Sequence, residues 1–264
     1  MFANVYTKTL RDLRKGFIGW TIGTVALIGF VVVSWPFIRD MDMSFLDEYP
    51  AEMRELFSFD AINTGPGYLN SQLFTSMLPI MFIVYGIGAG ARLLASEEDT
   101  RTMDVLLATP LSRTRLMLDK AAAAATGLVG LGLVVFLSIW AMASLADMGV
   151  SARYTAGASL AMVLLGLLYG AIAYSATAVT GKRSVAIAVS VSLAVAGYVF
   201  YLMAALVDAL ESWKWVTPFH HAIGVGPAID GSAGIPLSYL WLAIGAVLAV
   251  AVSRPIFQRR DIGL

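Results

Sequence analysis

Residues 96–120 read SEEDTRTMDVLLATPLSRTRLMLDK, and they separate two long windows, 61–91 and 121–146, that contain no Asp, Glu, Lys or Arg. Each window exceeds the ~20 residues that a helix needs to cross ~30 Å of hydrocarbon at about 1.5 Å per residue. The charged stretch is therefore expected to be a polar connection between two membrane-spanning helices.

Four more uncharged windows of sufficient length lie outside this stretch, at residues 16–38, 154–181, 184–207 and 231–253. The chain is 58% apolar and only 14% charged, against roughly 25% charged residues in ordinary soluble domains. Backbone polar groups in lipid must be satisfied within the segment, and the windows lack the alternation of barrel strands. The sequence predicts an all-α membrane protein with six transmembrane helices in a single domain, residues 1–264.

The distribution of basic residues predicts the orientation. With both termini in the cytoplasm, the connections on that side hold 14 of the 18 basic residues, and the outside holds only Arg39, Arg54, Arg153 and Lys214. Cytoplasmic loops carry an excess of Lys and Arg. We expect a multi-pass protein of the inner or plasma membrane with cytoplasmic termini.

Residues 2–15 alternate apolar and basic positions at helical spacing. This pattern favours a short N-terminal interfacial helix on the cytoplasmic surface. The alternative is a frayed basic tail that only sets the topology.

Further expectations concern single positions outside the charged stretch. The first span should end near Trp35-Pro36, where an interfacial aromatic residue precedes a helix-stopping proline. Pro79 should kink the second span, and residues 50–59 could form a short external helix. Three small-residue spacings are weak packing hints. They are Gly19-x-x-x-Gly23, Gly86-x-x-x-Gly90 and Gly166-x-x-x-Gly170.

The charged stretch itself has the pattern of a short helix. Ser96 would be the N-cap, and an apolar stripe follows at Met103, Leu106 and Leu107. Pro110 would end the helix, and Ser112 could cap the next one. The result would be a rigid rod joined to two spans. The alternative is a loop that rests on the lipid headgroups.

The run Glu97-x-x-x-x-Thr102-x-x-x-Leu106-Leu107-x-x-Pro110-x-x-Arg113, with Lys120 leading into an apolar span, resembles the signature of type-2 ABC exporter permeases. The order of elements is also similar: an interfacial helix, six spans, this motif between spans two and three, and an external excursion before span six. One residue departs from the pattern, because Arg101 stands where the family usually has Gly.

The resemblance implies that this rod is a coupling helix that inserts into a separate ATPase subunit. Two ATPase subunits would bind ATP and Mg, and a second permease chain, identical or homologous, would complete the transporter. This chain has no Gly-x-x-x-x-Gly-Lys-Ser/Thr loop of its own. The residues implied in coupling are Glu97, Thr102, Met103, Leu106, Leu107, Pro110, Ser112 and Arg113.

The uncharged spans suit an amphipathic or apolar cargo, such as a drug, lipid or peptide-like molecule, better than a small ion. Four aromatic hydroxyl residues are candidates for the substrate path: Tyr169, Tyr174, Tyr198 and Tyr201. Membrane lipid is an expected partner and nucleic acid is not.

Catalytic and metal sites are not expected. The chain has no cysteine, and its only histidines, His220 and His221, are adjacent. Adjacent residues do not form the i, i+4 zinc pair of a helix. A secondary transporter remains an alternative, although such carriers usually place charged groups at mid-membrane. A non-transporting membrane assembly component would explain the spans but not an ordered cytoplasmic rod.

Overall fold

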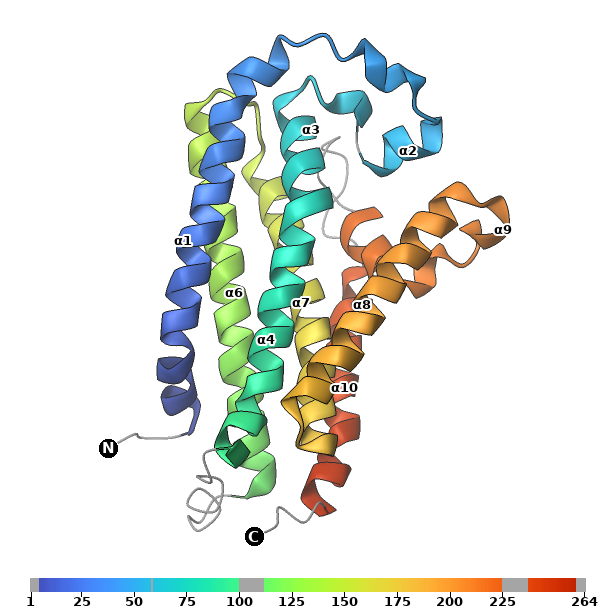
Figure 1. Ribbon diagram of the computed structural model, residues 1–264. Coiled ribbons are helices and arrows are strands. Elements are labelled where there is room, and N and C mark those ends of the chain that lie inside the picture. The colour runs from blue at the N-terminus through green and yellow to red at the C-terminus, as the bar shows by residue number, and fades with distance from the viewer. Residues whose placement is uncertain (1–4, 58, 100–111, 225–236, 260–264) are drawn as a thin grey trace.

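The computed structural model describes residues 5–57, 59–99, 112–224 and 237–259, and these residues form helices and connections without a strand (Figure 1). Six helical segments are long and apolar enough to cross a membrane, which confirms the predicted architecture. Their elements are α1 (Val5–Arg39), α4 (Leu78–Asp99) with the turns before it, α6 (Arg113–Leu145), α7 (Ala152–Thr180), α8 (Arg183–Leu206) and α10 (Tyr239–Arg259).

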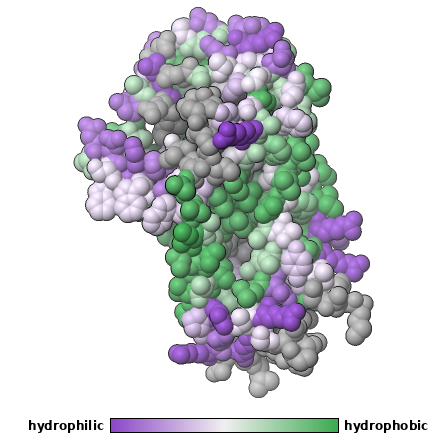
Figure 2. Space-filling model, turned by 180° about the vertical axis from the view of Figure 1, so that it is seen from behind, coloured by the Kyte–Doolittle hydropathy of each residue, from purple (hydrophilic) through white to green (hydrophobic). Residues whose placement is uncertain are grey.

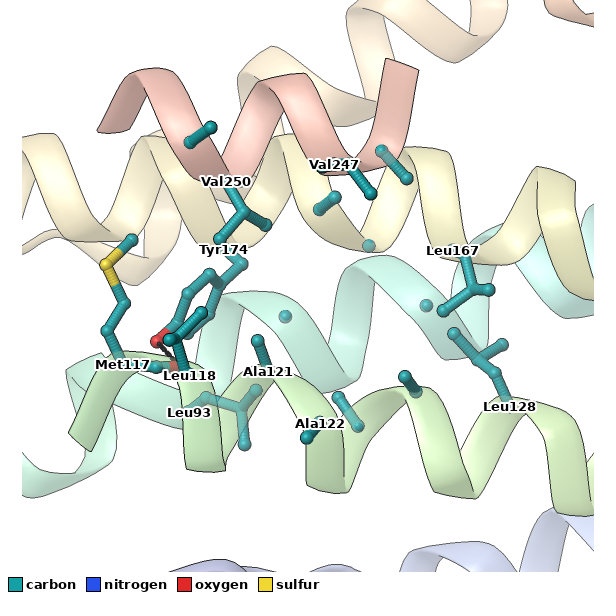
Figure 3. Close-up of a pocket in the computed structure, with 18 of the residues that line it drawn as sticks. Leu93, Met117, Leu118, Ala121, Ala122, Leu128, Leu167, Tyr174, Val247 and Val250 are labelled. Atoms are coloured by element: carbon teal, nitrogen blue, oxygen red, sulfur yellow. Dashed lines mark hydrogen bonds between the residues drawn. The ribbon is translucent and has the colours of Figure 1, made fainter. Parts of the chain in front are cut away.

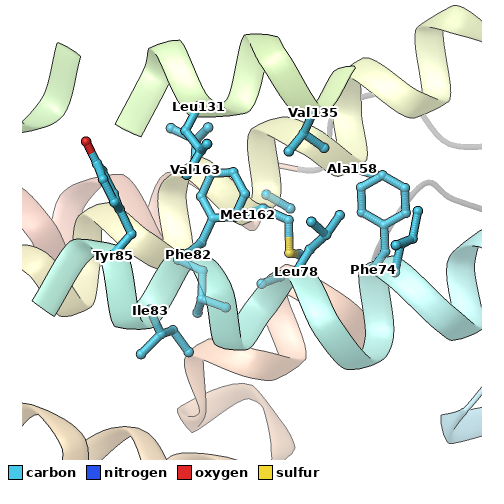
Figure 4. Packing of buried hydrophobic residues seen from close by; sticks show 14 of the residues in the cluster. Phe74, Leu78, Phe82, Ile83, Tyr85, Leu131, Val135, Ala158, Met162 and Val163 are labelled. Carbon is cyan, nitrogen blue, oxygen red and sulfur yellow. The ribbon is translucent and has the colours of Figure 1, made fainter. Parts of the chain in front are cut away.

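Helix α7 lies at the centre of the bundle. It packs against α4, α6, α8 and α10, whereas α1 packs chiefly on α6. Figure 4 shows the main core, where Phe82 of α4 lies among side chains of α6 and α7 such as Leu131 and Val163. The outward faces carry large apolar side chains, and they form a broad apolar zone between the two polar ends (Figure 2).

Two of the three glycine spacings pack against each other. A Cβ atom on Gly86 would overlap the carbonyl oxygen of Gly166, and one on Gly90 would overlap that of Gly170. The backbones of α4 and α7 therefore approach as closely as small residues allow. The third spacing differs, because a Cβ atom on Gly19 or Gly23 would meet nothing within 4 Å.

The second span is built from three consecutive helical segments, two of them α-helical and one a π-helix. It begins with α3 (Gly65–Leu69), which Thr64 caps by accepting a hydrogen bond from the Gly67 N–H at 3.1 Å. A π-helix, η3 (Asn70–Met77), then leads into α4. Pro79 follows this wide turn directly. Its ring would crowd the carbonyl four residues earlier in a regular α-helix, and the wider π turn relieves that contact.

Two sequence predictions about helix ends are wrong. Ser96 is not an N-cap, because α4 runs without interruption through Ser96 to Asp99. Pro36 does not stop the first span, since α1 continues to Arg39. The interfacial helix expected over residues 2–15 is not a separate element in the described part of the chain, because α1 is continuous from Val5.

The predicted external side carries short helical turns. The first loop contains η1 (Ser44–Glu48), α2 (Ala51–Leu56) and η2 (Phe59–Ala61), so the short helix expected over residues 50–59 is confirmed in part. Between α8 and α10, the chain forms α9 (Asp208–Glu211), η4 (Lys214–Val216) and a π-helix, η5 (His220–Gly224). Figure 1 shows α9 at the outer end of α8, which leans away from the bundle.

Candidate functional site

The segment that carries the family signature is held at both ends by helices. Helix α4 ends at Asp99, so Glu97 lies in its last turn. Helix α6 begins at Arg113, and Ser112 caps it by accepting a hydrogen bond from the Arg115 N–H at 3.2 Å, as the sequence predicted. The remaining signature positions lie outside the described residues: Thr102, Met103, Leu106, Leu107 and Pro110.

A buried lysine joins these two helices. Lys120 of α6 is only 2% exposed, and its Nζ donates a hydrogen bond of 2.6 Å to the carbonyl oxygen of Leu93 in α4. An ammonium group is expensive to bury unless it is hydrogen-bonded. The contact therefore fixes the start of α6 against the end of α4, directly beside the signature segment.

A second hydrophobic cluster surrounds this contact, separate from the main core. We call it the base cluster, and five of the six spans contribute to it. Its buried members are Val5, Leu93, Leu94, Leu116, Met117, Tyr174, Ala178 and Phe257. Among these, Tyr174 of α7 donates its hydroxyl proton to the carbonyl oxygen of Met117 at 2.8 Å. Helix α8 adds no residue to the cluster in the described part of the chain.

Polar contacts also join α6 to α10 at this end. Arg113 donates to the carbonyl oxygen of Gln258 at 3.2 Å, and the Gln258 side-chain amide donates to the Thr114 hydroxyl at 2.7 Å. Arg113 was predicted to act in coupling, and its described contact links the start of α6 to the last turns of α10.

The four tyrosines proposed for a substrate path do not lie together. The ring of Phe219 contacts Tyr169, at a centroid distance of 6.0 Å, and Tyr198, at 5.2 Å. Tyr201 is close to Gly224, because a Cβ atom there would lie 3.3 Å from its hydroxyl oxygen. These three residues lie beside residues 219–224, whereas Tyr174 belongs to the base cluster.

A cleft between four helices escaped the sequence analysis. It has a volume of about 620 Å³ and is lined by α4, α6, α7 and α10 (Figure 3). Its lining is almost wholly apolar, with Tyr174 and Met117 near one end and Leu128 and Leu167 near the other. The run Ala121–Ala125 was the available signal, since five consecutive alanines leave one helix without bulky side chains.

The two histidines have structural contacts. The Nε2 atom of His221 lies 2.7 Å from the carbonyl oxygen of Trp215, and the two imidazole rings pack edge to face. Burial, together with the neighbouring His221 and Lys214, lowers the pKa of His220. Over the ranges that the structure describes, no three His, Asp or Glu residues are grouped as a metal site would require.

The comparisons with known proteins agree with this architecture. The family model described as ABC-2 family transporter protein matches residues 3–262. No curated protein and no solved structure matches the chain. The match covers nearly all of the six-helix bundle, including both helices that hold the signature segment, and so the chain belongs to the ABC-2 family of transporter proteins as a multi-pass membrane permease.

Proposed function

We propose that this permease is the membrane subunit of an ATP-driven exporter whose ATP and Mg are bound by two separate ATPase subunits. A second permease chain, identical or homologous, would complete the complex. Residues 96–112 would dock into the ATPase, with the apolar stripe of Met103, Leu106 and Leu107 in its groove. Both termini would lie in the cytoplasm of a cell whose inner or plasma membrane holds the protein.

The contact between Lys120 and Leu93 carries this proposal. A segment that transmits movement from the ATPase to the membrane helices must be attached rigidly at both ends. A flexible attachment would absorb the displacement. Here the Lys120 Nζ binds α6 to α4 at 2.6 Å, and the base cluster binds both to α1, α7 and α10. Rigid-body movement of packed helices is a common form of conformational switching.

Helix α8 is the span that would not move together with the other five. Over the described ranges it contributes no residue to the base cluster, although it packs against α7 and α4. Closure of the two ATPase subunits would therefore tilt five helices together relative to α8. Phe219 contacts Tyr169 of α7 and Tyr198 of α8, so a relative movement of these two helices would change the packing of this aromatic group.

The cargo would be amphipathic or apolar. The rings of Tyr198 and Tyr169 meet at Phe219, and these aromatic surfaces with polar tips suit such molecules. Replacement of Tyr198 and Tyr201 by Ala should change the stimulation of ATPase activity by cargo. Unchanged stimulation across a panel of amphipathic compounds would remove these residues from the path.

The proposal is tested by a charge on the apolar stripe. Leu106→Asp or Leu107→Asp should leave the protein inserted but uncouple transport, because a carboxylate would enter an apolar groove. The matched control is Ala108→Asp, which adds the same charge one position beyond the predicted stripe. Transport and ATPase stimulation are measured together in proteoliposomes. Normal values in both stripe variants would contradict the coupling assignment.

A second variant tests transmission separately from docking. Lys120→Met removes a hydrogen bond from a charged donor, worth roughly 1.5–3 kcal/mol, without touching the stripe. The ATPase subunit should still co-purify, whereas transport per ATP hydrolysed should fall several-fold. Lys182→Met, at the exposed turn between α7 and α8, is the matched control. Equal coupling in both variants would contradict the role given to Lys120.

A further inference from the structure

The cleft between α6 and α10 is open on the side that faces away from the bundle. Its floor is formed by α4 and α7, which contribute Gly86, Gly90 and Gly170. Its lips carry exposed apolar side chains, with Leu118 of α6 at 54% and Val247 of α10 at 68% exposure. The surface that this protein turns to the membrane hydrocarbon therefore contains an open recess at this place.

Small side chains create the recess. The wall of α6 contains Ala121, Ala122, Ala124 and Ala125, and that of α10 contains Ala243, Ala246 and Ala251. Larger residues at these positions would fill the space. The volume of about 620 Å³ lies within the range of roughly 300–1,000 Å³ that is typical of ligand pockets.

The recess is longer along α6 than one leaflet of the bilayer core is thick. Along α6 it extends from Thr114 to Leu128, which corresponds to about 21 Å of helix at ~1.5 Å per residue. One half of a bilayer core is about 15 Å thick. The recess therefore runs through the full thickness of one leaflet, in the direction along which a lipid acyl chain extends.

Positive charge marks one end only. Arg254 of α10 and Thr114 of α6 both line the cleft, and Arg254 is exposed. Arg113 and Arg115 lie at the start of α6, and Arg259 lies in the last turn of α10. Asp119 is the acidic residue on the adjacent part of α6, and it does not line the cleft. The combination of an apolar channel with a cation at its mouth matches a phospholipid with an anionic headgroup.

We propose that this cleft binds one anionic phospholipid from the leaflet on the side of the signature segment. One acyl chain occupies the space between α6 and α10, and the phosphate lies at Arg254. Because the lining includes Met117 and Tyr174 of the base cluster, the bound chain packs against the helices that hold the signature segment. This site does not depend on the ATPase or on the proposed direction of transport.

The test is lipid retention by the full-length purified permease. The protein is exchanged into detergent with phosphatidylglycerol or phosphatidylcholine, and retained lipid is counted by native mass spectrometry. We expect one phosphatidylglycerol per chain. Arg254→Gln should weaken its retention roughly fivefold, which is the contribution of one basic residue near an anionic lipid. Arg259→Gln, on the same helix but outside the cleft, is the control.

A second pair of variants tests the acyl-chain position. Ala125→Leu fills the cleft and should abolish retention of both lipids, whereas Ala141→Leu adds the same side chain to an exposed position of α6 and should change nothing. Equal retention in Arg254→Gln and Arg259→Gln, or in Ala125→Leu and Ala141→Leu, would overturn the proposal. A disulfide cross-link between Leu118→Cys of one protomer and Val247→Cys of another would also overturn the proposal. It would show that a second copy of the chain covers the cleft.

Discussion

Helices α7 and α8 are neighbours in sequence and have nearly the same mean hydropathy, but they differ in their surroundings. In α7, 61% of the most apolar window is buried inside the protein, against 22% in α8. Gly181, in a left-handed conformation, ends α7, and α8 begins two residues later. The difference teaches that the contacts of a span with neighbouring helices, and not its hydropathy, decide whether it becomes central in a bundle.

The residues that face neighbouring helices explain this difference. In α7, Gly166 and Gly170 allow the backbone of α4 to approach, and the large residues on the remaining faces fill the main core. In α8, the buried positions Ala186, Ser190 and Ala194 recur every fourth residue, which gives a narrow inward stripe. The rest of α8 exposes apolar side chains such as Leu193 and Val195.

The strongest way to break the comparison is to separate α4 from α7. Gly86→Leu would place a side chain against the carbonyl oxygen of Gly166, and we expect a loss of about 3 kcal/mol or more in the free energy of unfolding, because overpacking forces the backbones apart. Gly88→Leu is the matched control, since a Cβ atom there meets nothing within 4 Å. Unfolding in mixed micelles measures both. Equal losses would contradict the close contact.

A smaller effect should distinguish the two helices directly. Leu165 of α7 is fully buried, whereas Leu193 of α8 is 50% exposed. Leu165→Ala should cost about 2 kcal/mol of unfolding free energy through the cavity that it leaves, although lipid is as apolar as leucine. Leu193→Ala should cost less than about 0.5 kcal/mol. A large cost at Leu193 would indicate that α8 is buried against another chain.

The smallest expected effect comes from one hydroxyl group. Tyr174→Phe removes the hydrogen bond to the Met117 carbonyl oxygen and should reduce the unfolding free energy by about 1 kcal/mol. On α8, Tyr198→Phe keeps the ring contact with Phe219 and should change the unfolding free energy by less than about 0.5 kcal/mol. Thermal unfolding in the same lipid measures both variants. Indistinguishable results would mean that the base cluster gains nothing from its polar contact.

Much of the fold could be predicted because each span is recorded locally in the sequence. Uncharged windows define the six helices, and Ser112 caps α6 through its own side chain. The glycine spacings of α4 and α7 were visible as separate hints. The sequence did not show which of these spacings would pack against each other, because the pairing depends on helices that are far apart in the chain.

The errors and omissions have a common physical cause. Ser96 has the side chain of an N-cap, but α4 continues through it, because an existing helix needs no new nucleus to extend. Lys120 was expected only to precede a span, yet it is buried and donates to Leu93. The cleft depends on alanines from α6 and α10 together. Tertiary contacts decide all three features.

The most direct test of the account is co-purification of the tagged chain from its native membrane, with mass spectrometry of the proteins that elute with it. The account predicts a stoichiometric subunit with a Gly-x-x-x-x-Gly-Lys-Ser/Thr loop, which is lost in Leu106→Asp and retained in Ala108→Asp. A permease that purifies alone and still transports cargo without ATP would contradict the account and favour a secondary transporter.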